Sequence, residues 1–414
     1  MRTLLSTVRS GGNAGKAART WRLQLGLAVL TALAVGWAGF GLTGCEDSMA
    51  PAGGLGTGGG AGTGSPGGAG ASVTGLGASC GQTPQQVDAP VTLLGADAFA
   101  VEARSLDRGW NHGYVLVGGL GDHVFVCGCG GGQLAGGCGV EDLVDAHGLL
   151  VPPAAAATLR CGRDLAPWGA SERDFYFTSW HYDGHLWSPV SALDEVALVW
   201  AATGTSSDNF WLSNNHRVSH TEGGKVALVP ELTGAVGLVG IQAAGKGELW
   251  AVDGRTSPLD MKGELVHFAA GAWERTGFAE VTSLSASSET NVWAVDATSI
   301  YHFDGSCWTR YLDPLVGAGR APMPLREVWT SGPWDTWVTA DDNILRHFNG
   351  EAWELMPLGD DAGLMLGRPW GTPTGLWVVR RHDVLPVVTS GETFAFRVSR
   401  PSLPAGNRAS AGAR

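Results

Sequence analysis

Five histidines of this chain are each followed, six residues later, by a tryptophan or, once, by a valine. The pairs are His181 and Trp187, His220 and Val226, His267 and Trp273, His302 and Trp308, and His347 and Trp353. Histidine can transfer protons or bind a metal near neutral pH. A metal ion, however, needs its ligands around one centre, each at about 2 Å. Because these histidines are regularly spaced along the chain, we expect them on separate units. We predict a structural role, in which each histidine bonds a neighbouring backbone group and packs beside an aromatic ring, and no metal site.

Acidic residues recur before a second landmark, an aromatic residue flanked by small apolar ones. The landmarks are Tyr176, Trp211, Trp250, Trp293, Trp337 and Trp377, and the acids are Asp174, Asp208, Glu248, Glu289 and Asp335. Calcium sites and glycosidases use carboxylates of this kind. Since the acids are also spread over the chain, we expect them to accept backbone N–H groups in turns. No nucleophile, zinc-protease, phosphate-loop or dinucleotide motif is present. We therefore predict no catalytic residue and no cofactor.

The landmarks recur at intervals typical of a repeat protein. The steps from Tyr176 to Trp377 are 35, 39, 43, 44 and 40 residues. Turn dipeptides lie between the paired histidines and tryptophans, and Asp304-Gly305 favours a hairpin with a type I′ turn. In one unit, strands are expected at 325–330, 335–339, 343–348 and 351–356. A period near ~40 residues with several short strands is typical of a β-propeller. We predict an all-β fold with four-stranded blades, seven being favoured and six or eight the alternatives.

The ends of the repeat region depart from this pattern. Residues 81–165 are interpreted as one degenerate blade with a cysteine-rich excursion, and residues 383–388 and 393–398 as the outer strands of the last unit. A strand from the other terminus is expected to close the ring, because closure protects the edge strand.

The repeats resemble those of BNR, or Asp-box-like, propellers, especially the Trp-rich repeat lipoproteins of myxobacterial type. The residues that carry the resemblance are 287–295 and 302–308, and it covers about 171–398. It implies the propeller fold. A true Asp box keeps one residue between its Asp and its Gly, whereas Asp304 and Gly305 are adjacent here. The resemblance therefore does not carry sialidase chemistry with it.

The N-terminal segment indicates export. Residues 1–22 contain five basic residues and no acid, and an apolar run at 23–40 precedes Leu-Thr-Gly-Cys, which ends at Cys45. This order is that of a secretory signal, and the tetrapeptide resembles a bacterial lipobox, whose cysteine is lipidated. A membrane-spanning anchor is the alternative. We predict a signal peptide at 1–44, a flexible Gly/Ala/Ser-rich linker at 45–79, a propeller at 80–400 and a disordered tail at 401–414. Within the propeller, 80–165 is the degenerate part and 166–400 holds the clear repeats.

Six cysteines remain once Cys45 is assigned to lipid. An even number in an exported chain favours disulfides, and six cysteines allow 15 connectivities. The candidates are Cys80, Cys127, Cys129, Cys138 and Cys161. A metal site in the Gly-rich stretch 127–140 is disfavoured, because no histidine joins it at a usual zinc spacing. Cys307 lies on a repeat strand, where a buried free thiol is the interpretation.

The predicted mature chain has 22 basic and 39 acidic residues, a net charge of −17. Such a charge argues against nucleic acid, which needs a basic face, and against docking on an anionic membrane surface. Contact with the membrane is expected through the lipid anchor alone.

Two insertions are expected on one face of the ring, at 253–263 and 313–324. Replacing both with Gly-Ser turns is expected to leave the fold intact. Their candidate binding residues, expected to have exposed side chains, are Arg255, Asp260, Lys262, Asp313, Arg320 and Met323.

Together these patterns predict a lipid-anchored protein of the bacterial cell envelope. Its propeller would bind a protein or a glycan without catalysis, because insertions on one face of a repeat scaffold commonly carry function. The alternatives are a glycan-active enzyme, either a sialidase-like hydrolase or a lyase, and a structural envelope subunit without a small ligand.

Overall fold

The computed structural model describes residues 84–95, 98–105, 112–120, 123–129, 138–142, 168–171, 174–177, 180–183, 185–189, 201–206, 208–213, 217–245, 247–256, 261–359, 365–372, 375–381 and 394–399. The chain divides into two units, Met1–Gly70 and Ala71–Arg414. All described residues belong to the second unit. The predicted signal peptide, Cys45, linker and tail lie outside them.

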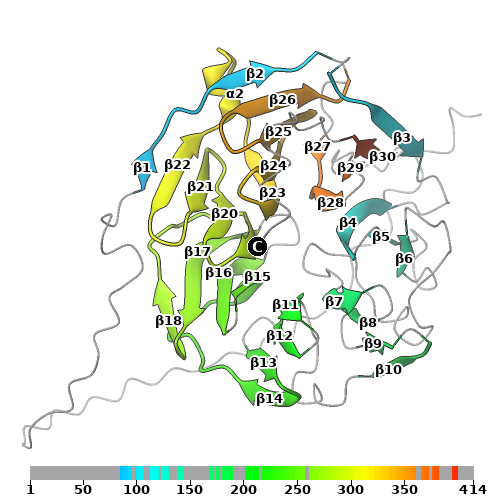
Figure 1. Ribbon diagram of the computed structural model, residues 1–414, viewed down its shortest axis with the longest axis vertical. Helices are drawn as coiled ribbons and strands as arrows, with labels where there is room; N and C mark the ends of the chain where they lie inside the picture. The colour runs from blue at the N-terminus through cyan, green and yellow to red at the C-terminus, as the bar shows by residue number, and fades with distance from the viewer. Residues whose placement is uncertain are drawn as a thin grey trace, which may run out of the picture. The chain divides into compact units, whose positions relative to one another are not determined.

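The described residues form seven sheets (Figure 1). The first contains β4 (His112–Leu120), β5 (His123–Cys129) and β6 (Cys138–Asp142). The second contains β7 (Trp168–Ser171), β8 (Asp174–Phe177), β9 (Trp180–Tyr182) and β10 (Trp187–Pro189), and the third β11 (Ala201–Ser206), β12 (Asn209–Ser213), β13 (Val218–Glu222) and β14 (Lys225–Leu228).

The next three sheets are the most regular. The fourth contains β15 (Leu238–Gly245), β16 (Glu248–Thr256), β17 (Met261–Ala269) and β18 (Ala272–Arg275). The fifth contains β19 (Ser283–Ser288), β20 (Asn291–Val295), β21 (Ser299–Phe303) and β22 (Trp308–Leu312), and the sixth β23 (Leu325–Gly332), β24 (Asp335–Ala340), β25 (Ile344–Phe348) and β26 (Trp353–Pro357). The strands of the sixth sheet confirm the four that its sequence predicts.

The seventh sheet combines both ends of the described chain. It contains β27 (Met365–Leu366), β28 (Trp370–Thr372), β29 (Gly375–Arg381), β30 (Phe394–Val398) and β3 (Val101–Ser105). Its outer strand is β3, so the predicted outer strand at 393–398 is wrong: β30 lies one place further in, because β3 pairs on its free edge. The other predicted strand, 383–388, lies outside the described residues.

The sheets close into a ring. Their inner strands contact one another in the order β4, β7, β11, β15, β19, β23, β28 and again β4 (Figure 1). Six of the sheets have four or five strands, and the first has three among the described residues. The all-β propeller fold is therefore confirmed. In the described part of the chain, no helix is both long and apolar enough to cross a membrane.

The first described residues, 84–95 and 98–105, contribute the outermost strands of three sheets, and we call them the strap (Figure 1). Within it, β1 (Gln85–Gln86) pairs in parallel with β22 and β2 (Val91–Leu93) pairs in parallel with β26. The strap ends in β3, which pairs with β30 and confirms ring closure by a strand from the other terminus. The interpretation of this stretch as part of a degenerate blade is wrong, because its strands complete three other sheets.

The hairpin predicted at Asp304-Gly305 is present, but its type I′ turn is wrong. Only Gly305 has a positive φ, of 92°. The Asp304 carboxylate accepts the backbone N–H groups of Ser306 and Cys307, both at 2.8 Å, and so holds a longer turn. Positive φ at both central residues occurs instead at Gly223-Gly224, where φ is 56° and 73°, and at Ala270-Gly271, where φ is 51° and 82°.

Candidate functional site

Each landmark aromatic of the second to sixth sheets stacks on the repeated histidine of the next strand. The two residues are cross-strand partners in every case. The ring centroids are 4.5 Å apart for Tyr176–His181, 3.8 Å for Trp211–His220, 4.1 Å for Trp250–His267, 4.1 Å for Trp293–His302 and 4.1 Å for Trp337–His347. The predicted packing of these histidines beside aromatic rings is confirmed. In the seventh sheet Arg397 takes the place of histidine, 5.9 Å from the Trp377 ring.

A third residue completes each arrangement, and we call the three an acceptor–aromatic–histidine triad. The acceptor lies two residues before the aromatic. The distances from the histidine Nε2 are 2.7 Å to Asp174, 2.7 Å to Asn209, 3.4 Å to Glu248, 2.9 Å to Asn291 and 3.2 Å to Asp335. The histidines were expected to bond the backbone; their partners are these side chains.

In two sheets the residue that accepts from the histidine is not the predicted acid. The predicted acids are Asp208 and Glu289, whereas the observed acceptors are Asn209 and Asn291. A search for acids misses these residues, because an amide oxygen accepts hydrogen bonds as a carboxylate does. The constant spacing of two residues before the aromatic is the signal that identifies them. Asp335 accepts from three side chains, those of Ser331, Trp337 and His347.

The fifth-sheet triad is neutral, and the side chain of Asn291 is fully hydrogen-bonded. The oxygen of Asn291 accepts the indole N–H of Trp293 at 2.9 Å and the Nε2–H of His302 at 2.9 Å. Its amide group donates to Ser287 at 2.7 Å and, across the sheet boundary, to Thr330 at 3.3 Å. Burial without a carboxylate partner lowers the pKa of His302 to about 4.

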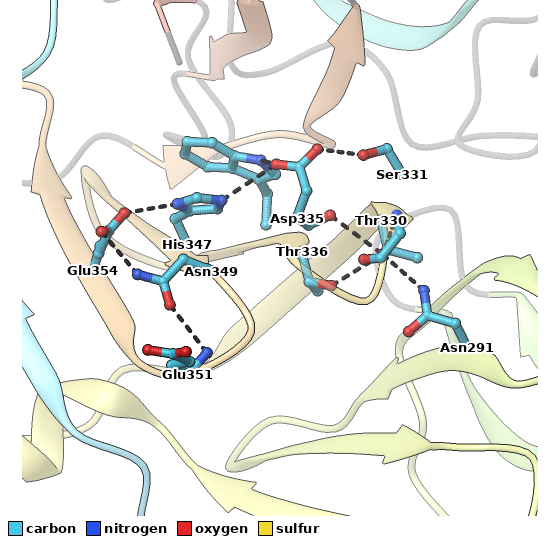
Figure 2. Close-up of polar contacts among 11 residues, drawn as sticks. Asn291, Thr330, Ser331, Asp335, Thr336, His347, Asn349, Glu351 and Glu354 are labelled. Atoms are coloured by element: carbon cyan, nitrogen blue, oxygen red, sulfur yellow. Dashed lines mark hydrogen bonds and ion pairs between the residues drawn. The ribbon is translucent and has the colours of Figure 1, made fainter. Parts of the chain in front are cut away.

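The sixth-sheet triad is charged instead. Figure 2 shows His347 between two carboxylates, with Nε2 3.2 Å from Asp335 and Nδ1 2.8 Å from Glu354. Burial opposes the imidazolium, but the hydrogen bonds to Asp335 and Glu354 outweigh it and raise the pKa of His347. The hydrogen bond from His347 lowers the pKa of Glu354. Replacing an amide by a carboxylate and adding Glu354 therefore changes the charge of one repeated histidine and leaves its position unchanged.

The neutral triad makes stability depend on pH. The folded state holds His302 unprotonated below its ordinary pKa, so the unfolded chain binds more protons between about pH 4 and 6.5. The contribution is complete above that window and is lost as pH falls through it, by about 1–3 kcal/mol. We expect His302→Gln to flatten the fall in urea-unfolding free energy between pH 7 and pH 4.5. An unchanged slope would show that His302 is protonated in the folded protein. His347→Gln is the matched control, because it removes a histidine whose pKa is raised.

The predicted binding residue Asp313 is buried, and its expected exposure is wrong. Its side chain is 0% exposed and caps the short helix α2 (Pro314–Gly317) by accepting from Leu315 at 3.1 Å. It also bonds Arg346 at 2.7 Å, and Arg346 is itself fully buried. The predicted binding residue Met323 is half-buried and packs against the core near Val91. This insertion therefore supports the sixth sheet, so its replacement by a Gly-Ser turn would not spare the fold.

The other insertion continues the hairpin of β16 and β17. Arg255 and Lys262 are cross-strand partners in it, and Lys262 is exposed, 3.5 Å from Glu280. Asp253 is buried and accepts the N–H groups of Val236 and Gly237 at 2.8 and 3.1 Å. Asp260 lies outside the described residues. Arg320 is exposed, as predicted.

One exposed aromatic residue was not singled out from the sequence. Trp334 lies in the turn between β23 and β24 and is 62% exposed. Its indole lies against the backbone of Gly350, in the turn between β25 and β26, so closely that any side chain at Gly350 would collide with it. The residues at the same position, directly before the triad acceptor, are Thr290 in the fifth sheet and Gly247 in the fourth. Trp334 thus presents a large aromatic surface, packed against Gly350, at a position where the fourth and fifth sheets carry smaller residues.

Among the described residues, no group of three His, Cys, Asp or Glu side chains is placed to hold a metal ion. The triads lie one to a sheet, so their histidines stay apart. Each has its ring stacked, and four of the five bond their acceptor, while His267 lies 3.4 Å from Glu248 without a hydrogen bond.

No family model matches the chain, and no curated protein matches it. Solved structures do. YCF48 bound to D1 peptide is 12% identical, with a TM-score of 0.49 over 76% of this chain and 100% of that one. YCF48 from Cyanidioschyzon merolae is 11% identical, with a TM-score of 0.48 over 72% and 98%. The RRP9 WD40 repeats are 11% identical, with a TM-score of 0.46 over 75% and 99%. Similarity at this level concerns the fold alone.

Proposed function

We propose that this chain is a binding module of the bacterial cell envelope, anchored by lipid at Cys45, whose propeller binds a protein or glycan partner without catalysis. Its place among the Trp-rich BNR-like lipoproteins is part of the proposal and rests on residues 287–295 and 302–308. The observation that carries the binding role is Trp334, 62% exposed and held against Gly350.

The chemistry of the recurring polar residues supports a binding role over catalysis. The triad histidines stack on aromatic rings, and most of their acceptors are occupied by hydrogen bonds inside the same sheet. Groups used in this way keep the sheets in register. A general acid or base must instead be within reach of a substrate.

Trp334 has the properties of an interface anchor. Large aromatic side chains in well-packed surroundings provide much of the binding energy of interfaces, and tryptophan is enriched among such residues. Packing against Gly350 holds the indole before a partner arrives, which reduces the entropy lost on binding. The same flat ring suits a peptide side chain or the apolar face of a sugar.

Substitution of Trp334 tests the proposal. We expect Trp334→Ala to reduce capture of the partner at least about tenfold in crosslinking on intact cells, since truncating an anchor costs ~2 kcal/mol or more. Its thermal midpoint should be unchanged, because the ring is largely in solvent. Val236→Ala, at a position 50% exposed and outside this turn, is the matched control. Equal capture by Trp334→Ala and the unaltered protein would remove Trp334 from the binding site.

The chemical class of the partner and the type of membrane anchor can be determined with the same protein preparations. A glycan array separates a sugar ligand from a protein, and a hydrolysis assay on any bound glycan separates binding from turnover. The protein is expected in the detergent phase of cell extracts, and Cys45→Ala in the aqueous phase. Detergent partitioning that survives Cys45→Ala would favour a membrane-spanning anchor instead.

A further inference from the structure

The start of the strap lies beside the start of β22. Gln85 is the partner of Thr309 and Gln86 of Arg310, and the two strands run in parallel. The backbone N–H of Val87 donates to Arg310 at 2.9 Å and continues the pairing. Because parallel strands share a direction, a continuation of β1 toward the N-terminus would run beside the residues that precede β22. Cys307 is the residue directly before β22.

Cys307 is disulfide-bonded, and the interpretation as a free thiol is wrong. It is half-buried at the end of the turn between β21 and β22. The turn holds its backbone at two points: its N–H donates to the Asp304 carboxylate at 2.8 Å, and its carbonyl accepts from the Asp304 N–H at 3.2 Å. The position of this sulfur-bearing residue is therefore fixed relative to the edge on which β1 pairs.

Register and chain length select the partner. Extending the register of Gln85 and Thr309 by two residues would place position 83 opposite Cys307, and position 83 is three residues from Cys80. The five steps from Gln85 back to Cys80 reach at most about 17 Å, enough to bring the two Cα atoms to the roughly 4.4–6.8 Å of a disulfide. We propose that Cys80 and Cys307 form a disulfide that ties the strap to the fifth sheet.

The other described cysteines lie elsewhere in the ring. Cys129 and Cys138 are direct cross-strand partners in the first sheet, and Cys127 lies on the same strand as Cys129. That sheet contacts the second and seventh sheets through β4. A bond from Cys307 to any of the three would have to cross the ring.

The bond forms by oxidation of two thiols. Cys80 and Cys307 together give up two protons and two electrons to a protein or small-molecule disulfide of the oxidising compartment, which is reduced to two thiols. The product links residues 227 positions apart. Without it, the strap would be held at this end by the two-residue strand β1. With it, tension entering from the N-terminal side is borne by a covalent bond before it reaches the ring. The cross-link itself does not depend on the proposed binding function.

Peptide mapping of the oxidised full-length protein tests this pairing. A peptide that contains Cys80 linked to one that contains Cys307 is expected, and it should disappear on reduction. Cys307→Ser and Cys80→Ser should each expose one additional thiol to alkylation without reduction. The double variant should lose no more thermal stability than either single variant, with a fall in the midpoint on the order of 5 °C. Mapping of the unaltered protein decides the matter even if the variants fold poorly. Linkage of Cys307 to Cys161 or Cys127, or alkylation of Cys307 before reduction, would overturn the proposal.

Discussion

Replacing Trp293 with alanine is expected to lower the free energy of unfolding by about 3–5 kcal/mol, the usual cost of removing a large buried aromatic. Trp293 is 0% exposed. It stacks on His302 in its own sheet and meets Trp353 of the next sheet edge-on, with centroids 6.2 Å apart at 89°. The alanine variant would open a cavity at the boundary of two sheets and leave the Asn291 oxygen with one donor fewer.

Urea unfolding followed by far-ultraviolet circular dichroism measures this loss. Trp334→Ala is the matched control, because it removes the same side chain from a position 62% exposed and should change the free energy by less than about 0.5 kcal/mol. Similar losses in the two variants would contradict the packing of Trp293 between the sheets. Trp293→Phe should recover part of the loss, since a smaller aromatic refills some of the space.

Arg346→Met should destabilise the protein by a similar amount, about 3–5 kcal/mol, because it leaves a buried carboxylate without its cation. All five guanidinium N–H groups of Arg346 are used. Nε and Nη2 bond Asp313 at 2.7 and 3.2 Å, both Nη atoms bond Asp342 at 2.8 and 2.9 Å, and Nη1 bonds the carbonyl of Ile344 at 2.8 Å. Asp313 has no exposed side-chain surface through which water could replace these bonds.

A double-mutant cycle with Asp313→Asn separates the ion pair from the effect of shape. The asparagine keeps an acceptor for the N–H of Leu315, but it has no negative charge that would be left unpaired when Arg346 is removed. The double variant should therefore be more stable than the sum of the two single losses implies, by at least about 1 kcal/mol. Strict additivity in equilibrium unfolding would mean that Arg346 and Asp313 do not depend on each other.

Much of the triad could be predicted from local sequence, because hairpin spacing is a local property. Nine residues separate Trp293 from His302 across a short turn, so their pairing follows from alternation and turn position. The acceptor was missed in two sheets because the search considered charge, whereas the site requires only a hydrogen-bond acceptor. The charge of His347 could not be predicted by the same route, since it depends on Glu354 from a third strand.

The candidate site was predicted less well. Two insertions were taken as exposed, yet Asp313 is buried, because its partner Arg346 lies 33 residues away on β25 and the sequence does not indicate that contact. Trp334 was not distinguished among the 18 tryptophans, since the sequence does not show which tryptophans are exposed and which lie in the core. Exposure is a property of the packed ring and not of the residue type.

By itself the sequence determined the repeat, the all-β propeller, the strand order within a regular unit and the packing of histidines beside aromatic rings. These depend on hydrophobic alternation and turn chemistry over about 40 residues. The tertiary structure alone decided where the strap runs, which strand closes the seventh sheet, which acids are buried and which histidine is charged. Each of these depends on segments far apart in the chain that meet only when the ring closes, and their contacts leave no periodic mark in the sequence.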